Sequence, residues 1–151
     1  MSIDIMLVED NEHKRERVRS LIREVLPDAI LYEAASYASG CQLAESREYR
    51  LIVLDISLPT YERAAGENGG RFRPFGGQEI ARKILRRGTR ARILFITQYQ
   101  AFSDRGNSFT FEDLGKSLSS ECGDNFLGLV YFDSSKSSWK LEVEKKLKDL
   151  K

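Results

Sequence analysis

The chain has 151 residues, of which 41% are hydrophobic and 31% charged, a composition that suits one globular domain with a substantial core. Its 24 basic and 23 acidic residues leave a formal charge of +1, which gives no reason to expect nucleic acid or an anionic membrane as a direct partner. The N-terminus lacks a signal-peptide pattern and no apolar stretch approaches membrane-spanning length, so we expect a cytoplasmic protein.

Strand-like and helix-like patterns alternate along the chain. Apolar runs predict strands over residues 3–8, 29–34, 51–55, 92–97 and 127–132. Helical spacing of apolar residues predicts helices that end at Pro27, cover 37–48, 78–87 and 111–120, and carry the stripe Trp139, Val143, Leu147 and Leu150. Five strands alternating with five helices favour an α/β fold, a doubly wound, mostly parallel sheet covered on both faces, in a single domain over 1–151.

The central strand is the run Leu51-Ile52-Val53-Leu54-Asp55, which is apolar until its last residue and is followed by Pro59. Such a run is typical of a strand buried on both faces of a parallel sheet. Asp55 then lies at the carboxyl end of the strand, the edge at which open α/β sheets bind their ligands. An Asp that caps the following turn is the alternative interpretation.

Two connections are longer than α/β folds usually need. Residues 60–77 are rich in glycine and arginine, and residues 98–110 are polar. Neither contains the spacing GxxxxGK[ST] or GxGxxG of a phosphate-binding loop. We interpret both as extended loops at the carboxyl edge of the sheet, with a partner-facing or site-covering role, and neutral elaboration remains the alternative.

Acidic residues follow two strands that are neighbours in a flavodoxin-like order, 2-1-3-4-5. Glu9 and Asp10 follow the first strand and Asp55 ends the third, so three carboxylates converge in one crevice. Carboxylates at such short distances repel one another unless a cation lies among them. Mg²⁺, which prefers oxygen ligands, is the natural partner. Thr97, at the end of the fourth strand, adds a hydroxyl. A carboxylate beside Mg²⁺ can act as a nucleophile toward a phosphoryl group.

Structural roles compete with this chemistry. Glu9 and Asp10 could cap the helix that follows them, and Thr97 is an ordinary strand residue whose case depends on the other positions. Cys41 and Cys122 lack metal-ligand spacing, and we expect reduced thiols. His13, the only histidine, is interpreted as an exposed residue of a first helical turn.

In these motifs the chain resembles the receiver domain of two-component response regulators, of the chemotaxis-regulator type. The resemblance rests on Ile5-Met6-Leu7-Val8-Glu9-Asp10-Asn11, on the strand that ends in Asp55, and on Ile93-Leu94-Phe95-Ile96-Thr97. It implies that Asp55 accepts a phosphoryl group from a histidine kinase or phosphotransfer protein. It further implies that Glu9, Asp10, Asp55 and the backbone carbonyl of Ser57 bind Mg²⁺, and that Thr97 contacts the phosphoryl oxygen.

The fifth strand departs from that family. Receivers carry a Lys-Pro pair at its end, where this chain has Phe132 and Asp133, and the nearest ammonium in sequence is that of Lys136. The aromatic switch residue is also absent, because Leu129 occupies its approximate position. Tyr131 is interpreted as a core residue. Loss of the Lys removes a positive charge from the phosphoryl site, which puts conventional switching in question.

Three functions follow from these features. The first is an atypical stand-alone receiver, not an enzyme, that is phosphorylated on Asp55 and signals by binding a downstream protein. The second is a phosphorylation-independent pseudo-receiver that acts as an interaction module, which Phe132 favours. The third is an aspartate-nucleophile phosphohydrolase, against which the missing DxDx[TV] motif of haloacid-dehalogenase-like enzymes argues: the chain has Asp55-Ile56-Ser57.

Overall fold

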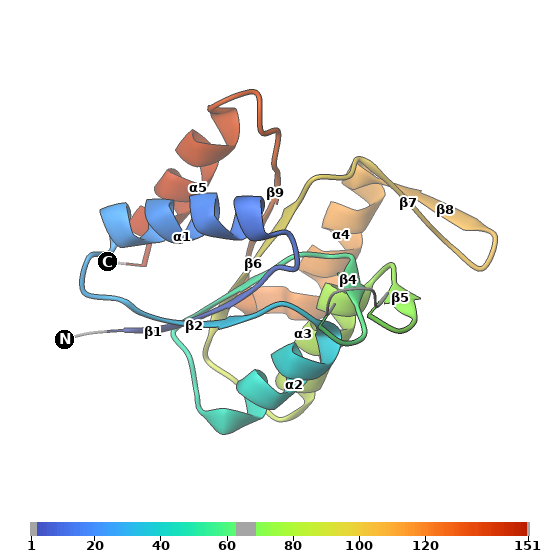
Figure 1. The fold of residues 1–151 in the computed structure, drawn as a ribbon, viewed down its shortest axis with the longest axis horizontal. Coiled ribbons are helices and arrows are strands. Elements are labelled where there is room, and N and C mark those ends of the chain that lie inside the picture. The colour runs from blue at the N-terminus through green and yellow to red at the C-terminus, as the bar shows by residue number, and fades with distance from the viewer. Residues whose placement is uncertain (1–2, 63–68, 151) are drawn as a thin grey trace.

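The computed structural model describes residues 3–62 and 69–150 (Figure 1). Five parallel strands form the central sheet in the order β2-β1-β3-β6-β9. Their bounds are β1 Asp4–Val8, β2 Ile30–Ala34, β3 Leu51–Leu54, β6 Arg92–Thr97 and β9 Phe126–Tyr131. The helices are α1 Glu12–Val25, α2 Tyr37–Ser46, α3 Gly76–Arg86, α4 Phe111–Cys122 and α5 Ser138–Lys148, and a short 3-10 helix covers Gly123–Asn125. The predicted flavodoxin-like fold is confirmed.

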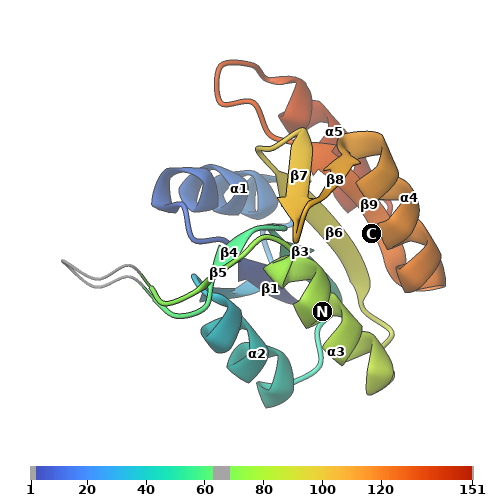
Figure 2. The same cartoon turned by 90° about the vertical axis from the view of Figure 1, so that its right-hand side faces the viewer.

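Helices cover both faces of the sheet, which explains why its inner strands are apolar without alternation (Figures 1 and 2). Ile5 and Leu7 of β1 pack toward α1 and α5, whereas Met6 and Val8 pack toward α2 and α3. Two core layers result, one on each face. Trp139 lies fully buried in the first layer, as its helical stripe predicted.

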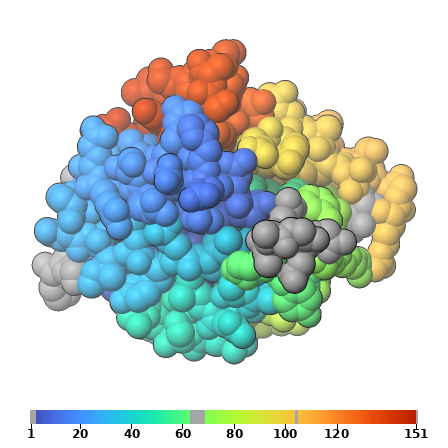
Figure 3. Space-filling model, viewed as in Figure 1, coloured from blue at the N-terminus to red at the C-terminus, as the bar shows by residue number. Residues whose placement is uncertain are grey.

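Helix α1 begins directly after the acidic residues of the first strand. The side chain of Asn11 caps it by accepting a hydrogen bond from the backbone N–H of Lys14 at 2.9 Å. The residues that α1 buries follow a helical stripe that includes one ammonium: Lys14, Val18, Leu21, Ile22 and Val25. Figure 3 shows α1 and α5 side by side on the surface of the molecule, in blue and red.

The two long connections contain short hairpins where the sequence predicted extended loops. In the first, β4 Leu58–Pro59 pairs with β5 Phe72–Arg73, and residues 63–68 of the predicted loop lie outside the described residues. In the second, β7 Ala101–Asp104 pairs with β8 Asn107–Thr110 and projects beside α4 (Figure 1). Its turn has positive φ at both Arg105 and Gly106, which suits the right-handed twist of a hairpin.

The β7–β8 hairpin is attached to the domain by aromatic contacts. Phe102 is buried, and its ring lies 6.0 Å from that of Phe75 and 6.4 Å from that of Tyr99. The ring of Phe109 meets Phe75 edge-on at 5.6 Å. Phe75 lies outside the hairpin and well before it in the sequence, so the polar composition of 98–110 alone did not indicate a hairpin. None of the helices described is long and apolar enough to cross a membrane.

Candidate functional site

The parallel register brings the predicted carboxylates together. Val8 of β1 pairs with Leu54 of β3, so the residues that follow both strands are neighbours, and the backbone N–H of Asp55 donates to Val8 O at 3.0 Å. Carboxylate oxygens of Glu9, Asp10 and Asp55 lie within 4.8 Å of one another. Glu9 and Asp55 are each only 3% exposed, whereas Asp10 is half-buried.

The backbone around Asp55 is packed closely against the start of α3. The N–H of Ile56 donates to Asp55 Oδ1 at 2.7 Å, and the N–H of Gly77, in the first turn of α3, donates to Ile56 O at 2.8 Å. A methyl group at Gly77 would overlap the carbonyl oxygen of Asp55, so only glycine fits there. The hydroxyl of Ser57 donates to Pro74 O at 2.9 Å, which holds the turn after Asp55 against the start of α3.

Thr97 occupies the end of β6, the strand next to β3. Leu54, the residue before Asp55, pairs with Phe95 of β6. Thr97 lies two residues after Phe95 and so extends just past the end of β3. Its side chain is fully buried, and its Oγ1 accepts a hydrogen bond from the N–H of Tyr99 at 3.2 Å. The structure therefore places Thr97 at the sheet edge that carries the carboxylates. Its contact with a phosphoryl oxygen remains a prediction, as does the Ser57 carbonyl ligand.

The site contains one residue that the sequence motifs did not predict, Lys14. Its side chain is 1% exposed, and its Nζ lies 2.6 Å from Glu9 Oε1 and 3.3 Å from Asp55 Oδ1. The same ammonium donates to Ile96 O at 2.8 Å. It therefore links the two buried carboxylates to the end of β6.

A signal for Lys14 was present in the sequence. Lys14 precedes Val18 by four residues and Ile22 by eight, so it continues the apolar stripe of α1 into the crevice. A lysine in the buried stripe of a helix is rare unless it is paired. The acidic residues just before the helix supply that pairing.

Burial dominates the electrostatics of the cluster. It raises the pKa of Glu9 to about 8, with a further contribution from the Asp55 carboxylate, and it raises the pKa of Asp55 above its ordinary value. Burial alone would lower the pKa of Lys14, but the carboxylates of Asp55 and Glu9 outweigh it, and the pKa of Lys14 is raised. Lys14 therefore stays protonated, whereas burial disfavours the ionised form of the two carboxylates. A bound cation would offset this desolvation cost.

The donor set fits a hard divalent cation. All three acidic side chains offer carboxylate oxygens, the ligands that Mg²⁺ prefers. When every group is ionised, three carboxylates and the Lys14 ammonium leave two negative charges, which is the charge that one Mg²⁺ neutralises. Half-buried Asp10 lies at the open side of the cluster, where a metal can keep its waters.

At the end of β9 the structure places a pair of aromatic rings where the resemblance to receivers predicts a lysine. Phe132 is 4% exposed, and its ring lies 4.8 Å from that of Trp139. The guanidinium of Arg17, from α1, lies 5.5 Å from the Phe132 ring and 5.4 Å from the Trp139 ring. The Lys14 Nζ lies 5.8 Å from the Phe132 ring on the side of the crevice.

The nearest lysine in sequence is not the one that reaches the site. The side chain of Lys136 is 70% exposed, and its Nζ lies 4.0 Å from Asp133 at the surface. Tyr131 is half-buried with its ring edge-on to Phe111 at 6.3 Å, so its interpretation as a core residue was only partly right. His13 is exposed, as predicted.

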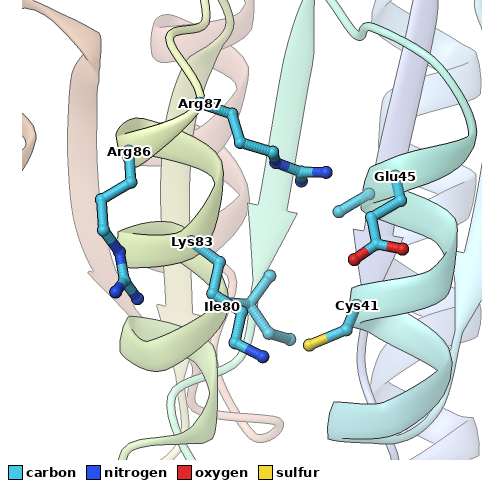
Figure 4. Close-up of a pocket in the computed structure, with 7 residues that line it drawn as sticks. Cys41, Glu45, Ile80, Lys83, Arg86 and Arg87 are labelled. Atoms are coloured by element: carbon cyan, nitrogen blue, oxygen red, sulfur yellow. The ribbon is translucent and has the colours of Figure 1, made fainter.

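A cavity of about 320 Å³ lies away from the carboxylates, between α2 and α3 (Figure 4). Figure 4 shows Lys83 and Arg87 on the α3 side, facing Cys41 and Glu45 of α2. None of the acidic site residues Glu9, Asp10 and Asp55 lines the cavity. The carboxylate cluster at the strand ends is therefore separate from this cavity.

Comparisons with known proteins agree with this fold, although no protein-family model matches the chain. The Detocs response regulatory protein DtcB of Enterobacter cloacae is 24% identical over 148 residues, which cover 97% of this chain and 99% of that protein. Among solved structures, the CheY-like response regulator receiver domain protein of Methanospirillum hungatei superposes with a TM-score of 0.64 at 15% identity, over 99% of this chain and 97% of that one.

A further structural neighbour is the receiver domain of the sensor histidine kinase PA1611 from Pseudomonas aeruginosa. It has a TM-score of 0.62 at 18% identity and covers 99% of this chain and 98% of that domain. That structure holds a magnesium ion coordinated in the active site cleft. The resemblance inferred from the sequence motifs is thus confirmed: the chain has the fold of response regulator receiver domains.

Proposed function

We propose that this chain is an atypical stand-alone response regulator receiver that accepts a phosphoryl group on Asp55 in the presence of Mg²⁺ and signals through protein-protein interaction. The observation that carries the proposal is the buried contact of Asp55 with Glu9, Asp10 and an ammonium at the carboxyl ends of neighbouring strands. A strand-end aspartate with both negative and positive neighbours has the surroundings that phosphoryl transfer requires.

In the proposed reaction a carboxylate oxygen of Asp55 attacks the phosphorus of a phosphohistidine on a histidine kinase or phosphotransfer protein. The new O–P bond forms as the N–P bond breaks, and the imidazole nitrogen leaves with the electron pair and is protonated. Glu9, Asp10 and the Ser57 carbonyl would hold Mg²⁺, which neutralises charge on the transferred group when bound. Thr97 would donate its hydroxyl hydrogen to a phosphoryl oxygen.

The chain would act as an acceptor and not as an enzyme with sustained turnover. We place it in the cytoplasm with a histidine kinase and a downstream protein as partners, a role that its similarity to a response regulatory protein supports. The balanced charge of +1 supports neither nucleic acid nor a membrane as a direct partner.

A phosphorylation-independent pseudo-receiver is the second candidate function. The specific observation in its favour is the aromatic contact of Phe132 with Trp139, in which Phe132 takes the place of the expected strand-end lysine. Such a protein would keep the fold and the acidic cluster but bind its partner constitutively.

Beryllofluoride, a mimic of the aspartyl phosphate, separates the two candidates. The protein is titrated first with Mg²⁺ and then with beryllofluoride, and amide NMR shifts are followed beside a matched Asp55→Asn variant. A working receiver gives saturable, Mg²⁺-dependent shifts around Asp55 and Thr97 that vanish in the variant. Absence of any response in the folded native protein would reject phosphoacceptance and favour the pseudo-receiver.

A further inference from the structure

The positive charge that the β9 end lacks is present in the crevice, but it comes from another element. We propose that Lys14, on helix α1, is the residue that binds the phosphoryl group on Asp55. This inference rests on the proposed function, because it assigns a role within the same phosphoacceptor site.

The position of the Lys14 ammonium carries the inference. Its Nζ already lies 3.3 Å from Asp55 Oδ1, so a phosphoryl group attached to that carboxylate adds anionic oxygens beside a charge held in place. Two further contacts of Nζ, with Glu9 Oε1 at 2.6 Å and with Ile96 O at 2.8 Å, hold the ammonium in its position. Little reorganisation is then needed when the charge on Asp55 increases.

The alternatives on neighbouring elements are engaged elsewhere. Arg17 lies over the Phe132 and Trp139 rings and donates to Ser134 O at 3.0 Å. Arg15 donates to the backbone carbonyl of Glu9 at 2.8 Å and pairs with Glu33. Lys136 extends into solvent. Of these four cations, Lys14 is the one in salt-bridge distance of the acceptor carboxylate.

The aromatic residue at the β9 end is compatible with this arrangement. Phe132 fills the volume beside Lys14 with its ring, 5.8 Å from the ammonium, so the helix lysine and the strand-end phenylalanine share one space. A lysine at position 132 would bring a second ammonium next to Lys14, and the two charges would repel each other. The two residues therefore form a consistent pair, with the charge on the helix and the apolar group on the strand.

A purely structural Lys14 is the competing explanation, since a buried ammonium also neutralises Glu9 and Asp55 in the resting protein. That role would affect folding and metal binding, whereas phosphoryl binding affects the affinity for beryllofluoride at saturating Mg²⁺. The affinities for Mg²⁺ and for beryllofluoride are therefore measured separately. One variant also transfers the positive charge from position 14 to position 132.

The first experiment compares native protein, Lys14→Gln and the double variant Lys14→Gln with Phe132→Lys. Glutamine keeps an N–H donor for Ile96 O but removes the charge. We expect Lys14→Gln to bind Mg²⁺ at least as tightly as native protein, because one positive charge has left the cluster, and to bind beryllofluoride about tenfold more weakly or worse, the size expected for a lost charge-assisted hydrogen bond. Phe132→Lys in that background should restore part of the loss.

The second experiment needs no substitution. Lysine side chains are labelled with ¹⁵N at Nζ, and the ammonium signals are followed by NMR while beryllofluoride is added to native protein in Mg²⁺. The protected Lys14 signal should shift with the same saturation curve as the Asp55 amide, and that of exposed Lys136 should not. This measurement also covers the case in which Lys14→Gln fails to fold.

The outcomes separate the inference from the proposed function. If native protein binds beryllofluoride but the Lys14 signal does not move, or if folded Lys14→Gln binds it as well as native protein, Lys14 is structural and the inference is overturned. If native protein does not bind beryllofluoride at all, the proposed function fails, and the inference fails with it.

Discussion

The ends of β3 and β9 lie at the same edge of one sheet, yet they differ in the kind of residue they present. The β3 end presents a buried carboxylate, Asp55, which accepts from the N–H of Ile56, and the carbonyl of Ile56 in turn accepts from the N–H of Gly77. The β9 end presents Phe132, whose ring packs at a tilt against that of Trp139 in α5 and lies beneath the guanidinium of Arg17. One strand end keeps the pattern expected of a receiver, and the other has become part of the core.

In this chain the ammonium beside Asp55 comes from a helix and not from the end of β9. A lysine side chain is long enough to reach the same crevice from a helix, provided that its stem is buried beside apolar neighbours. Lys14 does so from the first turn of α1. The loss of a strand-end charge is therefore compatible with a charged site, and three predictions sharpen the contrast between the two strand ends.

The largest expected effect is at the β9 end. Trp139→Ala removes a fully buried side chain that contacts the Phe132 ring and should lower the free energy of unfolding by about 3–5 kcal/mol, measured by urea denaturation. Trp139→Phe is the control: it keeps an aromatic ring and removes an indole N–H that has no hydrogen-bond partner within the described ranges, so its cost should be much smaller. Equal losses in both variants would contradict a role for the aromatic contact between Trp139 and Phe132.

The next effect is at the β3 end. Gly77→Ala would drive a methyl group into the Asp55 carbonyl, and backbone cannot yield as a side chain can, so we expect a loss of about 1–3 kcal/mol or more together with weaker Mg²⁺ binding. Gly115→Ala, in α4, is the matched helix substitution. There the new methyl meets only Leu129 at 3.7 Å, and better helix propensity should stabilise the protein by up to about 1 kcal/mol. Thermal unfolding and calorimetric Mg²⁺ titration of both variants measure the contrast, and a harmless Gly77→Ala would show that the β3 turn is not tightly packed.

The smallest effect concerns the lysine that follows the β9 end in sequence. Lys136→Met removes an exposed ammonium at 4.0 Å from Asp133 and should change stability by less than about 0.5 kcal/mol. Beryllofluoride affinity should also be unchanged. A clear loss of affinity in this variant would mean that the β9 end supplies its own charge after all, and the contrast between the two ends would disappear.

Local pattern was sufficient for most of the architecture. The apolar run before Asp55 and the helical stripe of Trp139 both report burial directly, because strands buried on two faces and amphipathic helices have different periods. The apolar run of the first strand likewise predicted that Glu9 and Asp10 lie at its carboxyl end. Parallel pairing then required these carboxylates to meet the one on β3.

Other features depended on partners distant in the sequence. The polar stretch 98–110 forms a hairpin because a left-handed Arg105-Gly106 turn and the contact of Phe102 with Phe75 stabilise it, and neither is evident from composition. The expectation that Lys136 was the nearest ammonium treated distance along the chain as distance in space. In the structure Lys136 belongs to the connection between β9 and α5, where its side chain is exposed at the surface.

The sequence by itself thus determined the order of the elements and the acidic half of the candidate site, because periodicity and strand-end position are local properties. Only the tertiary structure decided the basic half. Whether Lys14 points into solvent or into the crevice depends on how α1 packs on the sheet, which brings its ammonium to the Ile96 carbonyl and beside the Phe132 ring. A buried charge is stable only where its partners converge, and that convergence exists only in the folded chain.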